Sequence, residues 1–102
     1  MARVVVTDAA ARSLTELIAT HNLPADTTAR IREALALLRR FPRFGPALDP
    51  AMPEVRFMIG PWRWLVIVYA YYEADDTVAI LAFEDGRSAH SATSGRESKP
   101  RG

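Results

Sequence analysis

The longest apolar segment of the chain is residues 62–72, "WRWLVIVYAYY". Apolar side chains occupy both alternating faces of this segment, and Arg63 is its one charged residue. A strand that is apolar on both faces is usually covered on both sides, so the segment predicts the central strand of a sheet. It is too short for a transmembrane helix, which needs about 20 apolar residues.

Shorter strands and two helices are predicted around this central strand. β-Branched or alternating apolar residues predict strands at residues 3–6, 55–59 and 77–83. Apolar residues at helical spacing predict two helices between the first strand and Pro42, joined by a short link. The order β-α-α-β-β-β is an α+β architecture, with a helical hairpin packed on one face of a small, mainly antiparallel sheet.

Length and composition predict a single domain over residues 1–90. The 102 residues suit one domain, and a hydrophobic share of 49% is sufficient for a modest core. Four of the seven prolines fall within residues 42–53, which predicts a stiff loop before the second strand. Residues 91–102 are rich in Ser, Gly and charge without apolar periodicity, so a disordered tail is expected there.

The residue types restrict the chemistry that the chain can perform. It contains no cysteine, which excludes disulfides, thiolate metal sites and cysteine nucleophiles. The two histidines, His21 and His90, are far apart and lack metal-ligand spacing. We therefore expect neither a metal nor another cofactor. The apolar block at the N-terminus is too short for a signal peptide, so a cytoplasmic protein without membrane contact is expected.

Charge is distributed unevenly along the chain although the net charge is only +1. Seven arginines and three acids lie between Arg30 and Arg63, whereas five acids and no base lie between Glu73 and Asp85. Arginine presents a planar fork that suits phosphate or carboxylate. A solvated helix face balanced by an acidic turn explains the same distribution equally well. A strong nucleic-acid binder would usually be more basic overall.

Two arginines lie on either side of a predicted hairpin. Alternation within residues 55–59 and the central strand decides where Arg56 and Arg63 point. If the hairpin turns at Gly60-Pro61, both guanidiniums could lie near each other on the sheet face away from the helices and form an anion site. Alternatively, each arginine extends from a strand edge into solvent, and spacing alone favours this second interpretation.

The end of the last predicted strand, "FEDGRSAH" at residues 83–90, carries polar residues where a sheet finishes. Functional residues are common at such positions, and His90 could act as a general acid or base near neutral pH. Glu84 and Asp85 could pair with Arg63 or Arg87 and so neutralise a phosphate site. A solvated exit loop without function also explains the pattern and is favoured on sequence alone.

The aromatic residues around the central strand also allow two interpretations. Trp62, Trp64 and the tyrosines that follow could stack nucleic-acid bases beside an arginine. Aromatic side chains in strands more often pack in the core, and this interpretation is favoured.

Three stretches, taken in order, resemble the RelE/ParE superfamily of bacterial toxins. They are "RRFPRFGPALDP", "EVRFMIGPWRWLVIVY" and "TVAILAFEDGR". The family has a helix that ends in a Phe-Pro or Asn-Pro step, then a strand with an arginine, a Gly-x-aromatic-Arg turn and a basic closing motif. The resemblance covers roughly residues 3–90. It implies a small toxin that is encoded beside an antitoxin, which wraps and neutralises it.

The resemblance also implies roles for individual residues. RelE-like members cut mRNA in the ribosomal A site with basic residues and no metal, whereas ParE-like members inhibit DNA gyrase. Arg56 matches the arginine before the turn, Arg63 the arginine of the turn, and Arg87 the arginine of the closing motif. His90 falls roughly where RelE-like nucleases place a tyrosine or histidine. In a RelE-like enzyme these four residues would be catalytic.

Departures from the RelE-like pattern favour a ParE-like toxin. The loop "ALDPAMPE" has no lysine, and Glu84-Asp85 stands where the closing motif usually carries a base. Both acids would repel RNA phosphate. A metal-independent endoribonuclease and a nontoxic binding module remain alternatives. The expected partner is the cognate antitoxin in a hetero-oligomer, and the target is gyrase or the ribosome with its mRNA. The residues expected to bind the partner are Arg30, Arg39, Arg40, Arg56, Trp62 and Arg63.

Overall fold

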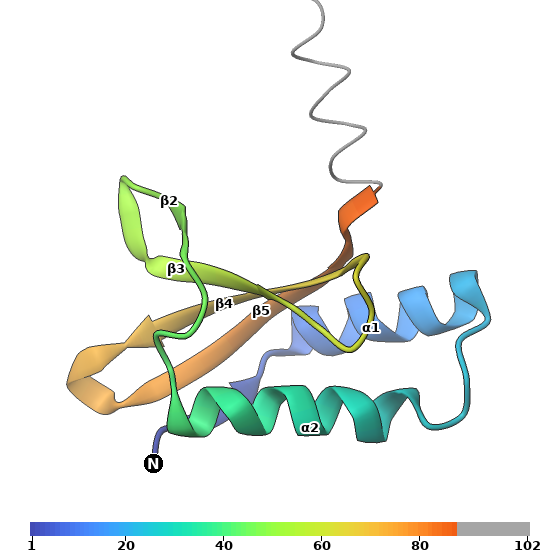
Figure 1. Ribbon diagram of the computed structural model, residues 1–102, viewed down its shortest axis with the longest axis horizontal. Helices are drawn as coiled ribbons and strands as arrows, with labels where there is room; N and C mark the ends of the chain where they lie inside the picture. Colours follow the sequence, from blue (N-terminus) through green and yellow to red (C-terminus); the bar gives the residue numbers. More distant parts are fainter. Residues whose placement is uncertain (88–102) are drawn as a thin grey trace, which may run out of the picture.

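Two helices cover one face of a five-stranded sheet in the computed structural model, which describes residues 1–87 (Figure 1). The sheet order is β1-β5-β4-β3-β2, with β1 parallel to β5 and every other pair antiparallel. The predicted α+β architecture with a mainly antiparallel sheet is therefore confirmed. The elements in chain order are β1 (Arg3–Val6), α1 (Asp8–His21), α2 (Thr27–Arg40), β2 (Ala47–Asp49), β3 (Met52–Ile59), β4 (Leu65–Tyr72), the 3₁₀ turn η1 (Glu73–Asp75) and β5 (Thr77–Asp85).

Local side-chain chemistry explains where the helices begin and end. The Thr7 hydroxyl accepts a hydrogen bond from the Ala10 N–H at 3.2 Å, which caps the N-terminus of α1. The same hydroxyl donates to the Ile80 carbonyl at 2.8 Å and so fixes α1 against β5. Asn22 ends α1 in the left-handed region at φ 52°. The C-terminus of α2 lies immediately before Phe41 and the helix-breaking Pro42.

The predicted order of secondary-structure elements lacked one strand, because the proline-rich loop contains the short strand β2. β2 is a three-residue edge strand that pairs Ala47 with Arg56 and Asp49 with Met52, with a register shift between the two pairs. β3 begins at Met52 and includes Pro53 near this irregular end, where a missing N–H is tolerated. A segment of three residues with two adjoining prolines carries no alternation that could predict a strand.

The turn between β3 and β4 is longer than the sequence predicted. Residues 62–64 belong to this turn and not to the central strand, which begins at Leu65. The Gly60 N–H donates to the Leu65 carbonyl at 2.8 Å, and the Leu65 N–H donates to the Trp62 carbonyl at 3.0 Å. These two bonds close the turn and leave the Trp62, Arg63 and Trp64 side chains free of the strand alternation.

The hydrophobic core fills the space between the helical hairpin and the sheet. Tyr69 of β4 is completely buried at its centre, and its hydroxyl accepts a hydrogen bond from the Gly45 N–H at 2.9 Å. Burial raises the pKa of Tyr69 above its ordinary value. No helix in the described part of the chain has the length and hydrophobicity to cross a membrane. The buried side chains of the core are Ala2, Ala10, Ile31, Leu35, Leu38, Met58, Leu65, Ile67, Tyr69, Val78, Ile80 and Phe83.

Candidate partner-binding surface and closing arginine motif

Arg56 and Arg63 do not form a pair on the open face of the sheet. Arg56 lies opposite Tyr69 in the β3–β4 register, and Tyr69 faces the helices, so Arg56 is on the helix side. Its Nη1 donates to the Gly45 carbonyl at 2.7 Å and to the Arg43 carbonyl at 3.4 Å. Arg63 lies beyond Gly60 in the turn. The anion site between the two arginines, the alternative that spacing did not favour, does not form here because the turn moves Arg63 out of the strand alternation.

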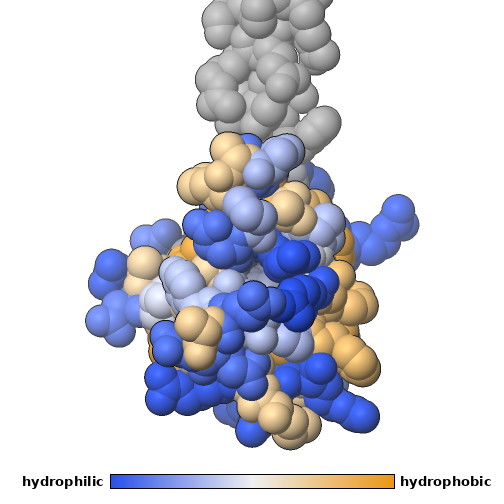
Figure 2. Space-filling model, turned by 90° about the vertical axis from the view of Figure 1, so that its left-hand side faces the viewer, coloured by the Kyte–Doolittle hydropathy of each residue, from blue (hydrophilic) through white to orange (hydrophobic). Residues whose placement is uncertain are grey.

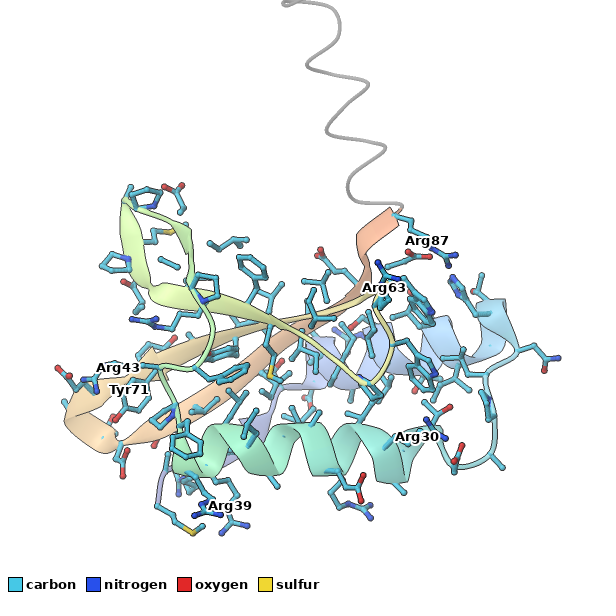
Figure 3. All side chains as sticks on the ribbon, in the orientation of Figure 1. Arg30, Arg39, Arg43, Arg63, Tyr71 and Arg87 are labelled. Carbon is cyan, nitrogen blue, oxygen red and sulfur yellow. The ribbon has the colours of Figure 1, made fainter. Side chains whose placement is uncertain are left out.

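The arginines expected to bind a partner fall at two ends of the molecule. Figure 3 shows Arg63 and Arg30 at one end, where Arg87 of the closing motif also lies, and Arg39 at the other. Arg40 is the last residue of α2, and its guanidinium carbon lies 5.8 Å from the Phe41 ring centroid. The end that carries the β2–β3 hairpin is largely hydrophilic, and hydrophobic residues gather along the right-hand side of Figure 2.

Aromatic rings stack on one another in the β3–β4 turn. The Trp62 and Trp64 ring centroids are 5.7 Å apart with an interplanar angle of 12°. His21 stacks on Trp64 at 5.0 Å and 7°, and the Arg30 guanidinium carbon lies 6.0 Å from the Trp62 ring centroid. The rings therefore stack on one another and pack against the core, as favoured from the sequence. Arg63, which lies between the two tryptophans in the sequence, is exposed.

The closing motif is a hydrogen-bonded cluster around Asp85. Arg87 donates from Nε to Oδ1 and from Nη2 to Oδ2 of Asp85, each at 3.2 Å, and its backbone N–H donates to Oδ1 at 2.9 Å. His21 Nε2 lies 2.8 Å from Asp85 Oδ2. The Arg87 guanidinium, followed by the His21 ring, holds the pKa of the Asp85 carboxyl well below its usual range.

The sequence indicated only part of this cluster. A pairing of Asp85 with Arg87 was one of the alternatives, and the structure contains it. His21 was not expected to take part, because it ends α1 and lies 64 residues away from Asp85 in the chain. His90, the proposed acid or base, and the expected tail at residues 91–102 lie outside the described residues. The described part of the chain has no group of His, Asp and Glu suited to hold a metal ion.

An apolar groove of about 690 Å³ lies between α1, α2 and β1. The large apolar residues that line it are Val4, Val6, Leu14, Ile18, Ile31, Leu35 and Phe83. Its lining also includes Arg3, Arg32 and Arg39, all three on exposed positions. Arg39 was expected to bind a partner, whereas Arg3 and Arg32 were missed because their common groove depends on how α2 packs beside β1.

A second groove, of about 640 Å³, lies between α2 and the β3–β4 turn. It carries both charge signs, with Asp26, Arg30 and Glu33 above the apolar Leu37 and Met58. Arg30 donates to Asp26 Oδ2 at 2.9 Å and is therefore already paired. The groove beside β1 is the better candidate for a partner, because its charged residues are all arginines.

Known structures share this fold. The toxin-antitoxin complex RelBE2 from Mycobacterium tuberculosis contains a chain with 26% identity and a TM-score of 0.61; the match covers 82% of this chain and 96% of that one. The conserved hypothetical protein HP0892 from Helicobacter pylori has 12% identity and a TM-score of 0.56, over 83% of this chain and 94% of that one. No protein-family model matches the sequence, and no curated protein matches it significantly. The chain has the fold of the RelE/ParE superfamily of toxins, as the resemblance of its sequence implied.

Proposed function

We propose that this protein is the toxin of a type II toxin-antitoxin pair, that it inhibits DNA gyrase in the manner of ParE-like members, and that a cognate antitoxin neutralises it. The fold likeness to a chain of the RelBE2 complex supports the toxin assignment. The engagement of Arg87 by Asp85 is the observation that carries the choice of a ParE-like target.

A RelE-like nuclease needs free cations to stabilise phosphate and transition-state charge. Two of the three arginines that match the family motifs are occupied within the protein. Arg87 forms its ion pair with Asp85, and Arg56 donates to two backbone carbonyls. An Arg87 whose Nε and Nη2 already donate to a carboxylate has fewer N–H groups left for RNA phosphate, so binding of a protein target fits the site better.

The sheet face opposite the helices supports the same choice. Strand alternation gives this face apolar side chains, among them Phe57 of β3 and Val66 and Val68 of β4. Glu84 is exposed on the same face beside the closing motif. RNA is bound mainly through its phosphates, and an apolar face with an acid at its end would not attract them.

The antitoxin would bind in the groove between α1, α2 and β1. An amphipathic helix can insert apolar residues at helical spacing into such a groove. Acids on the flanks of that helix would lie against Arg3, Arg32 and Arg39. The antitoxin segment is therefore expected to be a helix that is apolar on one face and acidic along its margins.

Controlled expression tests the toxin assignment. Induction of this chain alone should arrest growth, and coexpression of a small protein encoded next to it should restore growth and copurify with it. Normal growth with abundant folded protein would instead support a nontoxic binding module on the same fold.

A RelE-like ribosome-dependent endoribonuclease is the second candidate. It is favoured by Arg63, which is exposed and makes no hydrogen bond or ion pair within residues 1–87. Primer extension on translated mRNA after induction distinguishes the two functions. Codon-phased cuts that disappear in Arg63→Ala and His90→Ala variants would support the nuclease and overturn the ParE-like assignment.

A further inference from the structure

His21 faces a hydrogen-bond acceptor with each of its ring nitrogens. Nε2 lies 2.8 Å from Asp85 Oδ2, and Nδ1 lies 3.3 Å from the Leu17 carbonyl oxygen. A neutral imidazole carries one N–H and can donate to only one of these acceptors, whereas the imidazolium carries two. The geometry therefore suits the protonated ring, which donates to a carboxylate on one side and to a carbonyl on the other.

Asp85 connects His21 to the closing arginine. Its side chain is 8% exposed, and it accepts hydrogen bonds from both His21 and Arg87. A carboxylate with so little access to water needs charged or hydrogen-bonding partners. Loss of the His21 proton would leave Arg87 as the only cation beside Asp85, with a neutral Nε2–H of His21 as its second side-chain donor.

Trp64 connects the same two residues by a second route. The His21 ring stacks on Trp64, and the Arg87 guanidinium carbon lies 5.3 Å from the Trp64 ring centroid. The Trp64 carbonyl accepts a hydrogen bond from the Gly86 N–H at 2.6 Å, which fixes the backbone immediately before Arg87. His21 therefore contacts both groups that hold the Arg87 side chain, the Asp85 carboxylate and the Trp64 ring.

The surrounding charges do not replace His21 in this arrangement. Glu16 of α1 and Glu84 of β5 line the same hollow as His21 and Asp85, and both are acids. Arg30 of α2 lies over Trp62, one ring beyond Trp64. Arg63 of the turn is exposed. Apart from Arg87, His21 is the only basic side chain within residues 1–87 that lies within ion-pair distance of Asp85.

We propose that His21 is a positioning residue for Arg87, and that its protonated form holds the closing arginine against Trp64 through Asp85. The inference rests on the proposed function in so far as it makes Arg87 part of the surface that meets the target. Fixation of Arg87 is strongest while the His21 ring is protonated. It weakens when that ring loses its proton, because a neutral Nε2–H then replaces a charged donor to Asp85.

The NMR resonances of the two side chains test the positioning directly. We expect the Arg87 Nε–Hε signal of the wild-type protein to shift and to exchange faster with water as His21 loses its proton. His21→Phe keeps a flat ring on Trp64 but has no ring nitrogen that can gain or lose a proton, so the Arg87 signal of this variant should lose this pH dependence. Glu84→Gln removes a neighbouring acid that does not bond Asp85, and it should retain the wild-type pH dependence.

The wild-type titration tests the positioning contact even without a variant. An Arg87 signal that stays constant while His21 titrates would overturn the inference, as would a His21→Phe protein with an unchanged Arg87 titration. If His21→Phe does not fold, His21→Gln, which retains one donor, provides the same comparison.

Gyrase inhibition then separates this inference from the proposed function. The ratio of wild-type to His21→Phe inhibitory potency should change by about fivefold between acid and alkaline conditions, the lower end of coupling between linked groups. A constant ratio would overturn the positioning role in the activity. If the wild type inhibits gyrase at no pH, the proposed function fails, whereas coupled NMR titrations of His21 and Arg87 would still support the positioning contact.

Discussion

Both carboxylate oxygens of Asp85 accept hydrogen bonds from the Arg87 guanidinium, and Oδ1 also accepts one from the Arg87 backbone N–H. The closing arginine is therefore paired with the last residue of β5. The pair lies at the end of β5, and the Arg87 guanidinium carbon is 5.3 Å from the Trp64 ring centroid. Figure 3 shows Arg87 at the same end of the molecule as Arg63. Arg87 therefore has a carboxylate partner within the protein, which distinguishes it from an arginine whose whole guanidinium is free to bind phosphate.

Acid should weaken the contribution of Asp85 to stability. Arg87 and His21 lower the pKa of Asp85 in the folded protein below the ordinary value of about 3.9 expected when unfolded. Its stabilisation is therefore present above that ordinary value and is lost as the pH falls through the folded-state pKa. Asp85→Asn should unfold at lower urea concentration than the wild type at pH 7, and the difference should narrow below about pH 4.

Glu84→Gln is the matched control for this experiment. It removes one acid at the adjacent, exposed position on the other face of β5. We expect its urea midpoint at pH 7 to stay close to that of the wild type. An Asp85→Asn midpoint as high as that of Glu84→Gln would show that the Asp85 cluster does not stabilise the fold.

The bond between Gly45 and Tyr69 should be essential for the packing of the loop before β2. Tyr69→Phe removes the acceptor and leaves the Gly45 N–H unpaired in the core, which should lower the free energy of unfolding by about 1–3 kcal/mol. Gly45→Ala should lower the free energy of unfolding by at least as much, because an added Cβ would clash with the Phe57 carbonyl oxygen. Chemical denaturation measures the stability of both variants. A denaturation midpoint of Gly45→Ala equal to that of the wild type would contradict this packing.

Truncation should lower the stability of the protein at Arg56 but leave it nearly unchanged at Arg63. Arg56→Ala removes charged donors from the Gly45 and Arg43 carbonyls and should lower the free energy of unfolding by about 1–3 kcal/mol. Arg63→Ala changes an exposed turn residue, so its stability should stay within about 0.5 kcal/mol of the wild type. Thermal unfolding of both variants, together with growth assays, separates a structural arginine from a surface one. Equal destabilisation by the two changes would contradict the distinction.

Charge reversal at the groove should weaken binding of the antitoxin. Arg32→Glu combined with Arg39→Glu places acids opposite the expected acidic margins of the antitoxin helix. We expect the Kd to rise by about 10-fold, since an exposed ion pair contributes up to about 1 kcal/mol and two are lost. The difference should shrink at high salt.

Arg12→Glu controls for this experiment, because Arg12 is exposed on α1 but does not line the groove. Calorimetry with the purified antitoxin should give Arg12→Glu an affinity close to that of the wild type. Equal weakening by Arg12→Glu would mean that overall charge, and not the groove, attracts the antitoxin.

Most of the fold could be predicted because it depends on local patterns. The apolar spacing of both helices, the alternation in β3 and β5 and the continuous apolar run of β4 are all read within a few residues. β2 could not be predicted, since three residues between prolines become a strand only by pairing with β3. The extent of the β3–β4 turn was missed because Trp62 and Trp64 have the composition of a strand.

The candidate site was harder to predict than the fold. Asp85 and Arg87 are close in sequence, and their pairing was foreseen as a possibility. His21 joins them only because the C-terminal end of α1 packs against the end of β5, which no local pattern indicates. The arginines of the groove come from β1 and α2, and their proximity likewise depends on tertiary packing.

Supercoiling by purified DNA gyrase tests the central claim most directly. The purified protein should inhibit conversion of relaxed plasmid to the supercoiled form in proportion to its concentration, and an equimolar amount of antitoxin should restore supercoiling. Arg63→Ala, which keeps the fold, should show whether the exposed turn contributes to that inhibition. Undiminished supercoiling at protein concentrations that arrest growth would contradict the ParE-like assignment.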